Sequence, residues 1–266
     1  MSRKNQFFVN SFAEEDFAGN PAAVCIVDEW PSEAGMQQIA KENNLSETAF
    51  CLCLRDDESE PRFHIRWFTP GCEVDLCGHA TLATAYALFR HFFKEAQVLH
   101  FQSRSGELHV RKTDDFVILM DFPAYSLDKV SEASEIKAVN DVLGHVSFEL
   151  FRGIDYVAVL PDAEAVKAFV PDFGRITSLP GNYNLLITAR GNGKFDFVSR
   201  CFFPKEAIDE DPVTGSAHCT LGPLWAKRLG KTDLTAYQAS ERGGILHLTV
   251  GKDRVIVGGK AVEVHR

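Results

Sequence analysis

A short pattern that occurs twice constrains the fold of this chain more than any other feature of its sequence. FHIRWFTP (residues 63–70) matches FVSRCFFP (residues 197–204) in Phe, Arg, Phe and Pro at the same places, 134 positions apart. Both stretches carry aromatic and β-branched residues that favour strands, and both end in a proline that cannot continue a central strand. The chain is therefore predicted to contain two copies of one structural unit.

The match extends on both sides of these strands. After the following loop, an Ala/Leu-rich helical pattern begins near Gly78 in the first copy and near Gly215 in the second. Upstream, residues 22–42 and 155–172 both read as a strand, a turn and a helix, and an apolar strand follows each. This order predicts an α+β protein of two similar domains, each with a mixed sheet around a central helix.

The boundary between the two domains is predicted near residue 124, because Pro123 ends a strand and a polar helical pattern follows it. The domains are then residues 1–124 and 125–266, and a strand near the C-terminus is expected to cross back to the first sheet. Two similar domains facing each other form a cleft, which is a favoured place for a small-molecule site.

Charge and cysteine usage exclude several classes of protein. The chain has 28 basic and 37 acidic residues, and this acidic surplus, without a stripe of Lys and Arg, argues against a nucleic-acid partner. No apolar run approaches the roughly 18 residues of a membrane span, and acidic residues interrupt the first apolar stretch too early for a signal peptide. The seven cysteines are scattered without a disulfide or zinc pattern, so a reducing, cytoplasmic environment is expected.

The two glycine-led helix starts are candidate anion sites. The unpaired N–H groups and the positive end of the helix dipole suit a carboxylate or a phosphate. Gly78 and Gly215 allow a close approach to the backbone, and Thr214 or Ser216 can cap the second helix while offering a hydroxyl. The alternative is that both are ordinary capped helices.

Three further side chains are candidates for chemistry, and each has a structural alternative. His79 lies in the first turn of its helix, where the dipole favours a neutral imidazole that donates a hydrogen bond or relays a proton. Asp211 is either a turn residue or part of the second helix entry, and Glu47 is either a surface residue or a site residue. His64, His79 and His218 lack metal-ligand spacing, and no nucleotide-binding motif is present, so neither a metal nor a cofactor is expected.

Four segments resemble the signature motifs of the phenazine-biosynthesis isomerase-like (PhzF-like) family. They are NPAAVC (20–25), SETAF (46–50), RWFTPGCEVDLCGHATLATA (66–85) and DPVTGSAH (211–218). Their order and spacing match over essentially the whole chain. The resemblance implies the diaminopimelate-epimerase fold, in which two pseudo-twofold-related domains each wrap a barrel-like sheet around a central helix. A homodimer is common in the family and is expected here.

The resemblance also implies a cofactor-independent isomerase that moves a proton on a small carboxylated substrate. In the phenazine pathway that substrate is a dihydro-hydroxyanthranilate. The family's catalytic glutamate falls on Glu47, and a carboxylate base in a dry cleft is expected to have a raised pKa. The residues that the resemblance implies for support of catalysis are His79, Asp211 and Ser216. The candidates for substrate contact are the residues of the two helix entries, Cys77, Gly78, Thr214 and Gly215.

Two other functions remain open from the sequence. Epimerases similar to this family use two thiols, and Cys77 occupies the first of these places while Pro212 occupies the second. The first of these functions is therefore an amino-acid racemase or epimerase that combines Cys77 with a partner other than cysteine. The second is the function of a protein that binds a small carboxylate without catalysis.

Overall fold

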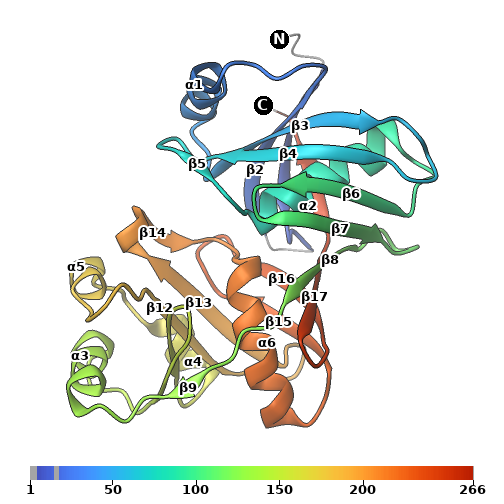
Figure 1. The fold of residues 1–266 in the computed structure, drawn as a ribbon. Coiled ribbons are helices and arrows are strands. Elements are labelled where there is room, and N and C mark those ends of the chain that lie inside the picture. Colours follow the sequence, from blue (N-terminus) through green and yellow to red (C-terminus); the bar gives the residue numbers. More distant parts are fainter. Residues whose placement is uncertain (1–4, 15–17, 266) are drawn as a thin grey trace. The chain divides into compact units, whose positions relative to one another are not determined.

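The structure is a computed structural model of the chain, and it describes residues 5–14 and 18–265. The chain divides into two compact units, an N-terminal unit of residues 1–121 and 258–266 and a C-terminal unit of residues 122–257 (Figure 1). It passes from one unit to the other within strands β8 (Ile118–Pro123) and β17 (Arg254–Gly259). Among the described residues, no helix has the length and apolar character needed to cross a membrane.

Among the described residues, the N-terminal unit is a mixed sheet with two α-helices and one short π-helix, η2 (Leu88–Phe92), which continues the second α-helix. In spatial order its strands run β18, β1, β2, β3, β4, β6, β7 and β8, and β5 pairs with β4. The bounds are β1 (Gln6–Ser11), β2 (Asn20–Val27), β3 (Glu47–Arg55), β4 (Arg62–Phe68), β5 (Glu73–Val74), β6 (Val98–Ser103), β7 (Gly106–Lys112) and β18 (Ala261–Val264), with helices α1 (Glu33–Asn43) and α2 (Gly78–Ala87). The β2–β3 and β4–β6 pairs are parallel, and the other pairs are antiparallel.

The C-terminal unit has the same kind of sheet with four α-helices and one short 3-10 helix, η3 (Pro204–Glu206). Its strands run β9, β10, β11, β12, β13, β15 and β16, and β14 pairs with β13. The bounds are β9 (Asp128–Lys129), β10 (Glu149–Arg152), β11 (Tyr156–Val159), β12 (Leu185–Arg190), β13 (Phe197–Phe203), β14 (Ile208–Asp211), β15 (Asp233–Gln238) and β16 (Gly244–Val250), with α3 (Ala133–Leu143), α4 (Ala163–Ala168), α5 (Phe173–Thr177) and α6 (Gly215–Leu229).

The pairing pattern of one unit repeats in the other. β2 and β3 are parallel and β3 is antiparallel to β4, just as β11 and β12 are parallel and β12 is antiparallel to β13. β4 then runs parallel to β6, as β13 runs parallel to β15. In addition, β18 pairs with β1 in the first unit, as β9 pairs with the equivalent strand, β10, in the second. The repeat that FHIRWFTP and FVSRCFFP predicted is therefore confirmed as a repeat of topology.

The arginine of the repeated pattern has the same role in both units. Arg66 on β4 donates from Nε and Nη2 to the two carboxylate oxygens of Glu73, both at 2.7 Å. Arg200 on β13 makes the same bidentate pair with Glu210, at 2.8 Å for each bond. Because both pairs are largely shielded from water, each ties a strand firmly to the short strand that follows it.

Helix α2 lies inside the curved sheet of the N-terminal unit (Figure 1) and packs against β1, β2 and β3. Its small side chains allow this close packing, and most of the helix is buried. Two threonines within it satisfy their hydroxyls locally, Thr81 on the carbonyl of Cys77 and Thr84 on the carbonyl of Ala80. The start of α2 is consequently held rigidly in the sheet.

Candidate active site

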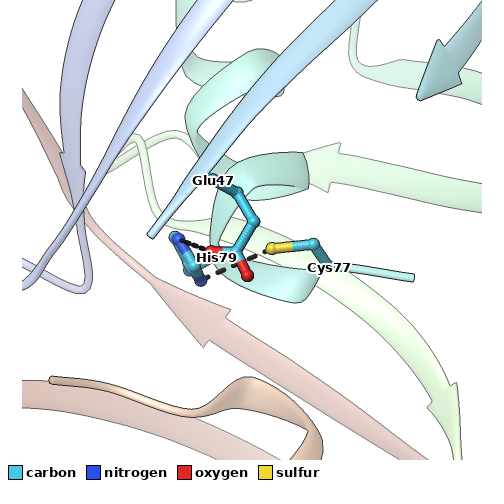
Figure 2. A group of neighbouring side chains, drawn as sticks. All are labelled: Glu47, Cys77 and His79. Atoms are coloured by element: carbon cyan, nitrogen blue, oxygen red, sulfur yellow. Dashed lines mark hydrogen bonds and ion pairs between the residues drawn. The ribbon is translucent and has the colours of Figure 1, made fainter. Parts of the chain in front are cut away.

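The fold of the N-terminal unit brings Glu47, Cys77 and His79 together (Figure 2). Glu47 begins β3, and Cys77 and His79 flank the glycine at which α2 begins. His79 Nε2 lies 3.1 Å from Glu47 Oε2, and His79 Nδ1 lies 3.5 Å from Cys77 Sγ. The imidazole thus links a carboxylate on one side to a thiol on the other.

Backbone contacts fix the position of this group. The hydroxyl of Ser11, at the end of β1, donates to the carbonyl of His79 at 2.6 Å. Glu47 is held at the start of β3 by parallel pairing with Ala22 of β2. The three side chains are between 6% and 8% exposed, so they are shielded from water but not sealed from a ligand.

Burial and proximity set the charge state of the three groups. Burial by itself raises the pKa of Glu47, but the charge of His79 and the polar side chains of His79 and Cys77 beside it outweigh burial, and the pKa lies below its ordinary value of 4.5. Burial by itself lowers the pKa of His79, but Cys77 and Glu47 raise it well above 6.5. Burial and the charge of Glu47 raise the pKa of Cys77. At neutral pH the group is therefore a carboxylate, an imidazolium and a thiol.

This charge state corrects two expectations from the sequence. Glu47 was expected to have a raised pKa, and His79 was expected to be neutral because it lies at the positive end of a helix dipole. Both expectations are wrong for the same reason. In each case neighbouring groups outweigh burial: the charge of His79 at 3.1 Å acts on Glu47, and Cys77 and then Glu47 act on His79.

The C-terminal unit holds the second group of predicted residues around the start of α6. Asp211 ends β14, Thr214 is the residue before the helix, and Gly215 begins it. The hydroxyl of Thr214 donates to Asp211 Oδ2 at 2.6 Å and makes no capping bond to the helix, which corrects the expected capping role. Ser216 is exposed in the first turn of α6.

Gln238, which no sequence motif singled out, organises this loop. Its Oε1 accepts a hydrogen bond from the Thr214 N–H at 2.8 Å, and its Nε2 donates to the Asp211 carbonyl at 2.7 Å and to the Thr214 hydroxyl at 3.1 Å. Gln238 is fully buried at the end of β15. A glutamine on the same face of the strand as Leu234 and Ala236 is the signal that the sequence offered.

His218, one turn into α6, has a structural role. Its Nδ1 lies 2.7 Å from the carbonyl of Thr214, and its Nε2 lies 3.3 Å from the hydroxyl of Ser199. Burial lowers the pKa of His218 to about 4, so the ring is neutral. It can then donate to Thr214 and accept from Ser199, which fixes the first turn of the helix.

The predicted residues thus form two groups, one in each unit. Glu47, Cys77, Gly78 and His79 belong to the N-terminal unit, and Asp211, Thr214, Gly215 and Ser216 belong to the C-terminal unit. Each group surrounds the glycine at which its helix begins.

Two repeated units with a glycine-led helix in each place the chain in a fold that known epimerases share. A hydroxyproline epimerase from Agrobacterium vitis has the same fold, with a TM-score of 0.57 over 100% of this chain and 92% of its own, at 13% sequence identity. At that identity the likeness concerns the fold alone.

The family follows from closer relatives. The model of the phenazine biosynthesis-like protein (PhzC-PhzF) family matches residues 9–266, and the chain belongs to this family. An uncharacterized isomerase from Pseudomonas aeruginosa is 46% identical over 255 residues, covering 96% of this chain and 94% of the relative. The crystal structure of a PhzF-family protein from Enterococcus faecalis is 44% identical, with a TM-score of 0.87 and 98% of each chain covered. The protein is an isomerase of this family.

Proposed function

We propose that this isomerase moves a proton between two carbons of a small carboxylated metabolite, without a cofactor, and that Glu47 is the general base. The observation that carries the proposal is the buried contact at 3.1 Å between Glu47 and His79. It keeps Glu47 ionised, and only an ionised carboxylate can accept a proton from carbon.

The reaction divides into two proton transfers. Glu47 removes a proton from one carbon, and the electron pair of that C–H bond moves into the adjoining π-system of the substrate. Glu47, now neutral, returns a proton to a second carbon of the same system. The net change is a shifted double bond, and no electrons leave or enter the substrate.

The lowered pKa of Glu47 narrows the substrate class. A carboxylate with a low pKa is a weak base, so the C–H bond that it breaks must be flanked by groups that delocalise the resulting charge. An unsaturated acid whose reacting C–H bond adjoins its π-system meets this requirement, whereas a simple saturated acid does not. The imidazolium of His79 supports the step by stabilising negative charge that develops beside it.

Asp211 and Ser216 remain predictions from the family resemblance, and we propose that they orient the substrate. Thr214 and Gln238 support this role, because their hydrogen bonds hold the backbone around Asp211 in one arrangement. The first backbone N–H groups of α6 lie beside them, and the side chain of the N-cap residue, Thr214, does not accept a hydrogen bond from these groups. A substrate carboxylate is the expected ligand of such groups.

The test is proton exchange in deuterated water. Small unsaturated carboxylic acids are screened by NMR for deuterium uptake at carbon, first with the wild-type protein. Glu47→Gln removes the base and is expected to lower the exchange rate by about 10²–10⁴-fold. Glu29→Gln, an exposed glutamate, is the matched control and should leave the rate unchanged. A Glu47→Gln variant with wild-type exchange would overturn the assignment.

The racemase is the second candidate, and the thiol of Cys77 favours it because the thiol lies beside His79 within the same buried group. A racemase inverts the carbon that takes up deuterium, whereas the proposed isomerase moves the double bond. Cys77→Ala should abolish exchange if the thiol transfers the proton, and should leave most of it if Glu47 alone does.

A further inference from the structure

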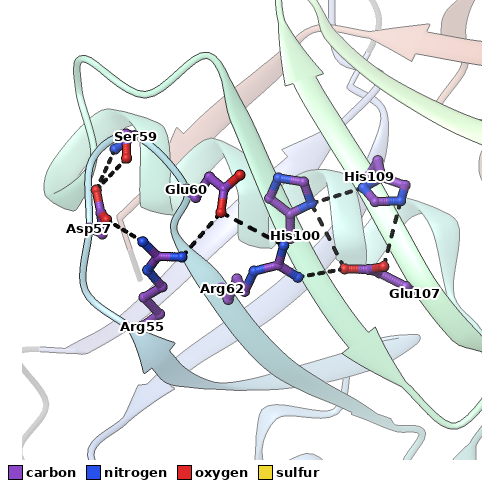
Figure 3. Close-up of polar contacts among 8 residues, drawn as sticks. All are labelled: Arg55, Asp57, Ser59, Glu60, Arg62, His100, Glu107 and His109. Atoms are coloured by element: carbon purple, nitrogen blue, oxygen red, sulfur yellow. Dashed lines mark hydrogen bonds and ion pairs between the residues drawn. The ribbon is translucent and has the colours of Figure 1, made fainter.

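Two histidines lie directly opposite each other on neighbouring strands of the N-terminal unit (Figure 3). His100 on β6 pairs in register with His109 on β7. Their Nδ1 atoms are 2.9 Å apart. At this distance one ring donates a hydrogen bond and the other accepts it. Two nitrogen atoms that can each bind a metal ion therefore point toward each other.

A carboxylate completes the group. Glu107 lies two residues before His109 on β7, which places both side chains on the same face of the sheet. Glu107 Oε2 lies 3.8 Å from His109 Nε2, and Oε1 lies 3.9 Å from His100 Nδ1. One ligand atom from each of the three residues falls within 4.8 Å of the other two.

We propose that His100, Glu107 and His109 bind a divalent transition-metal ion of the zinc type and so tie β6 to β7. Two imidazole nitrogens and one carboxylate oxygen are a donor set for zinc, nickel or copper, whereas magnesium and calcium are held by oxygen ligands. Zn–N distances of about 2.0–2.1 Å in a tetrahedral site separate two nitrogens by roughly 3.3 Å. The two rings need only open slightly from 2.9 Å for the ion to replace the shared proton.

Solvent exposure of the site allows the ion to enter and water to fill the remaining coordination. The side chains of Glu107 and His109 are 43% and 52% exposed. That of His100 is 18% exposed, so its position is better defined by its surroundings. With one ring held by its surroundings and two ligands exposed, a metal ion can reach the site from solution without unfolding the β6–β7 hairpin.

Arg62 on β4 competes with the ion. Its Nη1 donates to Glu107 Oε1 at 2.9 Å, and its guanidinium places a positive charge beside the site (Figure 3). Removing that charge should free the carboxylate and strengthen metal binding. Arg62→Gln is therefore expected to raise the affinity, the opposite of the effect expected from any variant that removes a ligand.

The experiment measures the affinity of the full chain for Zn²⁺ and Ni²⁺ by titration calorimetry, together with the melting temperature in each ion. Wild-type protein should bind both ions and melt at a higher temperature in their presence, and Mg²⁺ should have no effect. His100→Ala and His109→Ala should each weaken binding by about tenfold or more. His91→Ala is the matched control, because His91 is an exposed histidine whose Nε2 lies 2.7 Å from the carboxylate of Glu263 and which is not part of the proposed group.

Four results would overturn the proposal. They are no Zn²⁺ or Ni²⁺ binding by wild-type protein, unchanged binding by a His100→Ala, His109→Ala double variant, weaker binding by Arg62→Gln, and loss of binding in Cys77→Ala but not in His100→Ala. The last result would place the ion at the other described group of thiol, imidazole and carboxylate. Because binding and melting are measured without a substrate, the result does not depend on the proposed reaction.

Discussion

At the scale of single residues, one contact governs the chemistry of the candidate site. Glu47 and His79 are each unfavourable as isolated buried ions, and their 3.1 Å approach stabilises both in the charged form. Cys77 stays protonated beside them. The group therefore holds a base and two proton donors within a few ångströms, which is the requirement for general acid–base catalysis.

The contact predicts how stability changes with pH. The pKa of Glu47 is lowered from 4.5, so its contribution to stability is present above pH 4.5 and is lost as the pH falls through the folded-state pKa. The pKa of His79 is raised from 6.5, so its contribution is fully present below pH 6.5 and is lost as the pH rises through the folded-state pKa. Both contributions to stability are fully present between pH 4.5 and 6.5.

Urea denaturation of wild-type protein and Glu47→Gln across a pH series checks this prediction. The difference in unfolding free energy between the two should be largest between about pH 4.5 and 6.5 and should shrink on both sides. Glu29→Gln, a change at an exposed glutamate, is the control variant. A difference between wild type and Glu47→Gln that grew steadily toward low pH would contradict the charged pair.

At the scale of elements, the end of β17 shows how closely the chain packs as it returns to the N-terminal unit. A Cβ atom at Gly259 would overlap the ring of Phe12, which follows β1. Phe12 is itself fully buried, with a positive φ of 60°, so its ring has little freedom to move aside. Glycine is required here for close approach and not for a turn.

Gly259→Ala is expected to destabilise the protein by about 1–3 kcal/mol, because the added methyl overpacks a filled site. The midpoint of urea unfolding measures the effect. Gly71→Ala is the control, since a Cβ there would lie 3.7 Å from its nearest neighbour in ordinary contact. Equal stability of the two variants would show that Phe12 adjusts without penalty.

At the scale of the whole molecule, the last strand belongs to the first unit. β18 pairs with β1 over four residue pairs, from Ser11 with Ala261 to Phe8 with Val264. Ser11 also holds the carbonyl of His79. The C-terminal strand therefore supports the candidate site through β1, although it is far from that site in sequence.

Deleting residues 261–266 removes this strand and is expected to lower the melting temperature and the proton-exchange rate together, because β1 loses one of its two partners. Circular dichroism during heating and the deuterium assay measure the two effects. Deleting only residues 265–266 leaves β18 intact and is the control. Wild-type melting and exchange after the longer deletion would show that β1 needs no support from β18.

The amino-acid sequence by itself determined the repeat, the order of the elements, the two glycine-led helix starts and the residue types around them. These properties follow from local patterns, such as a proline that ends a strand or a glycine before a helical run. The tertiary structure alone decided that Glu47 meets His79, that Gln238 reaches Thr214, and that His100 faces His109. Each of these depends on strand register and on distances of a few ångströms, and charge states depend on those distances more steeply than on residue type.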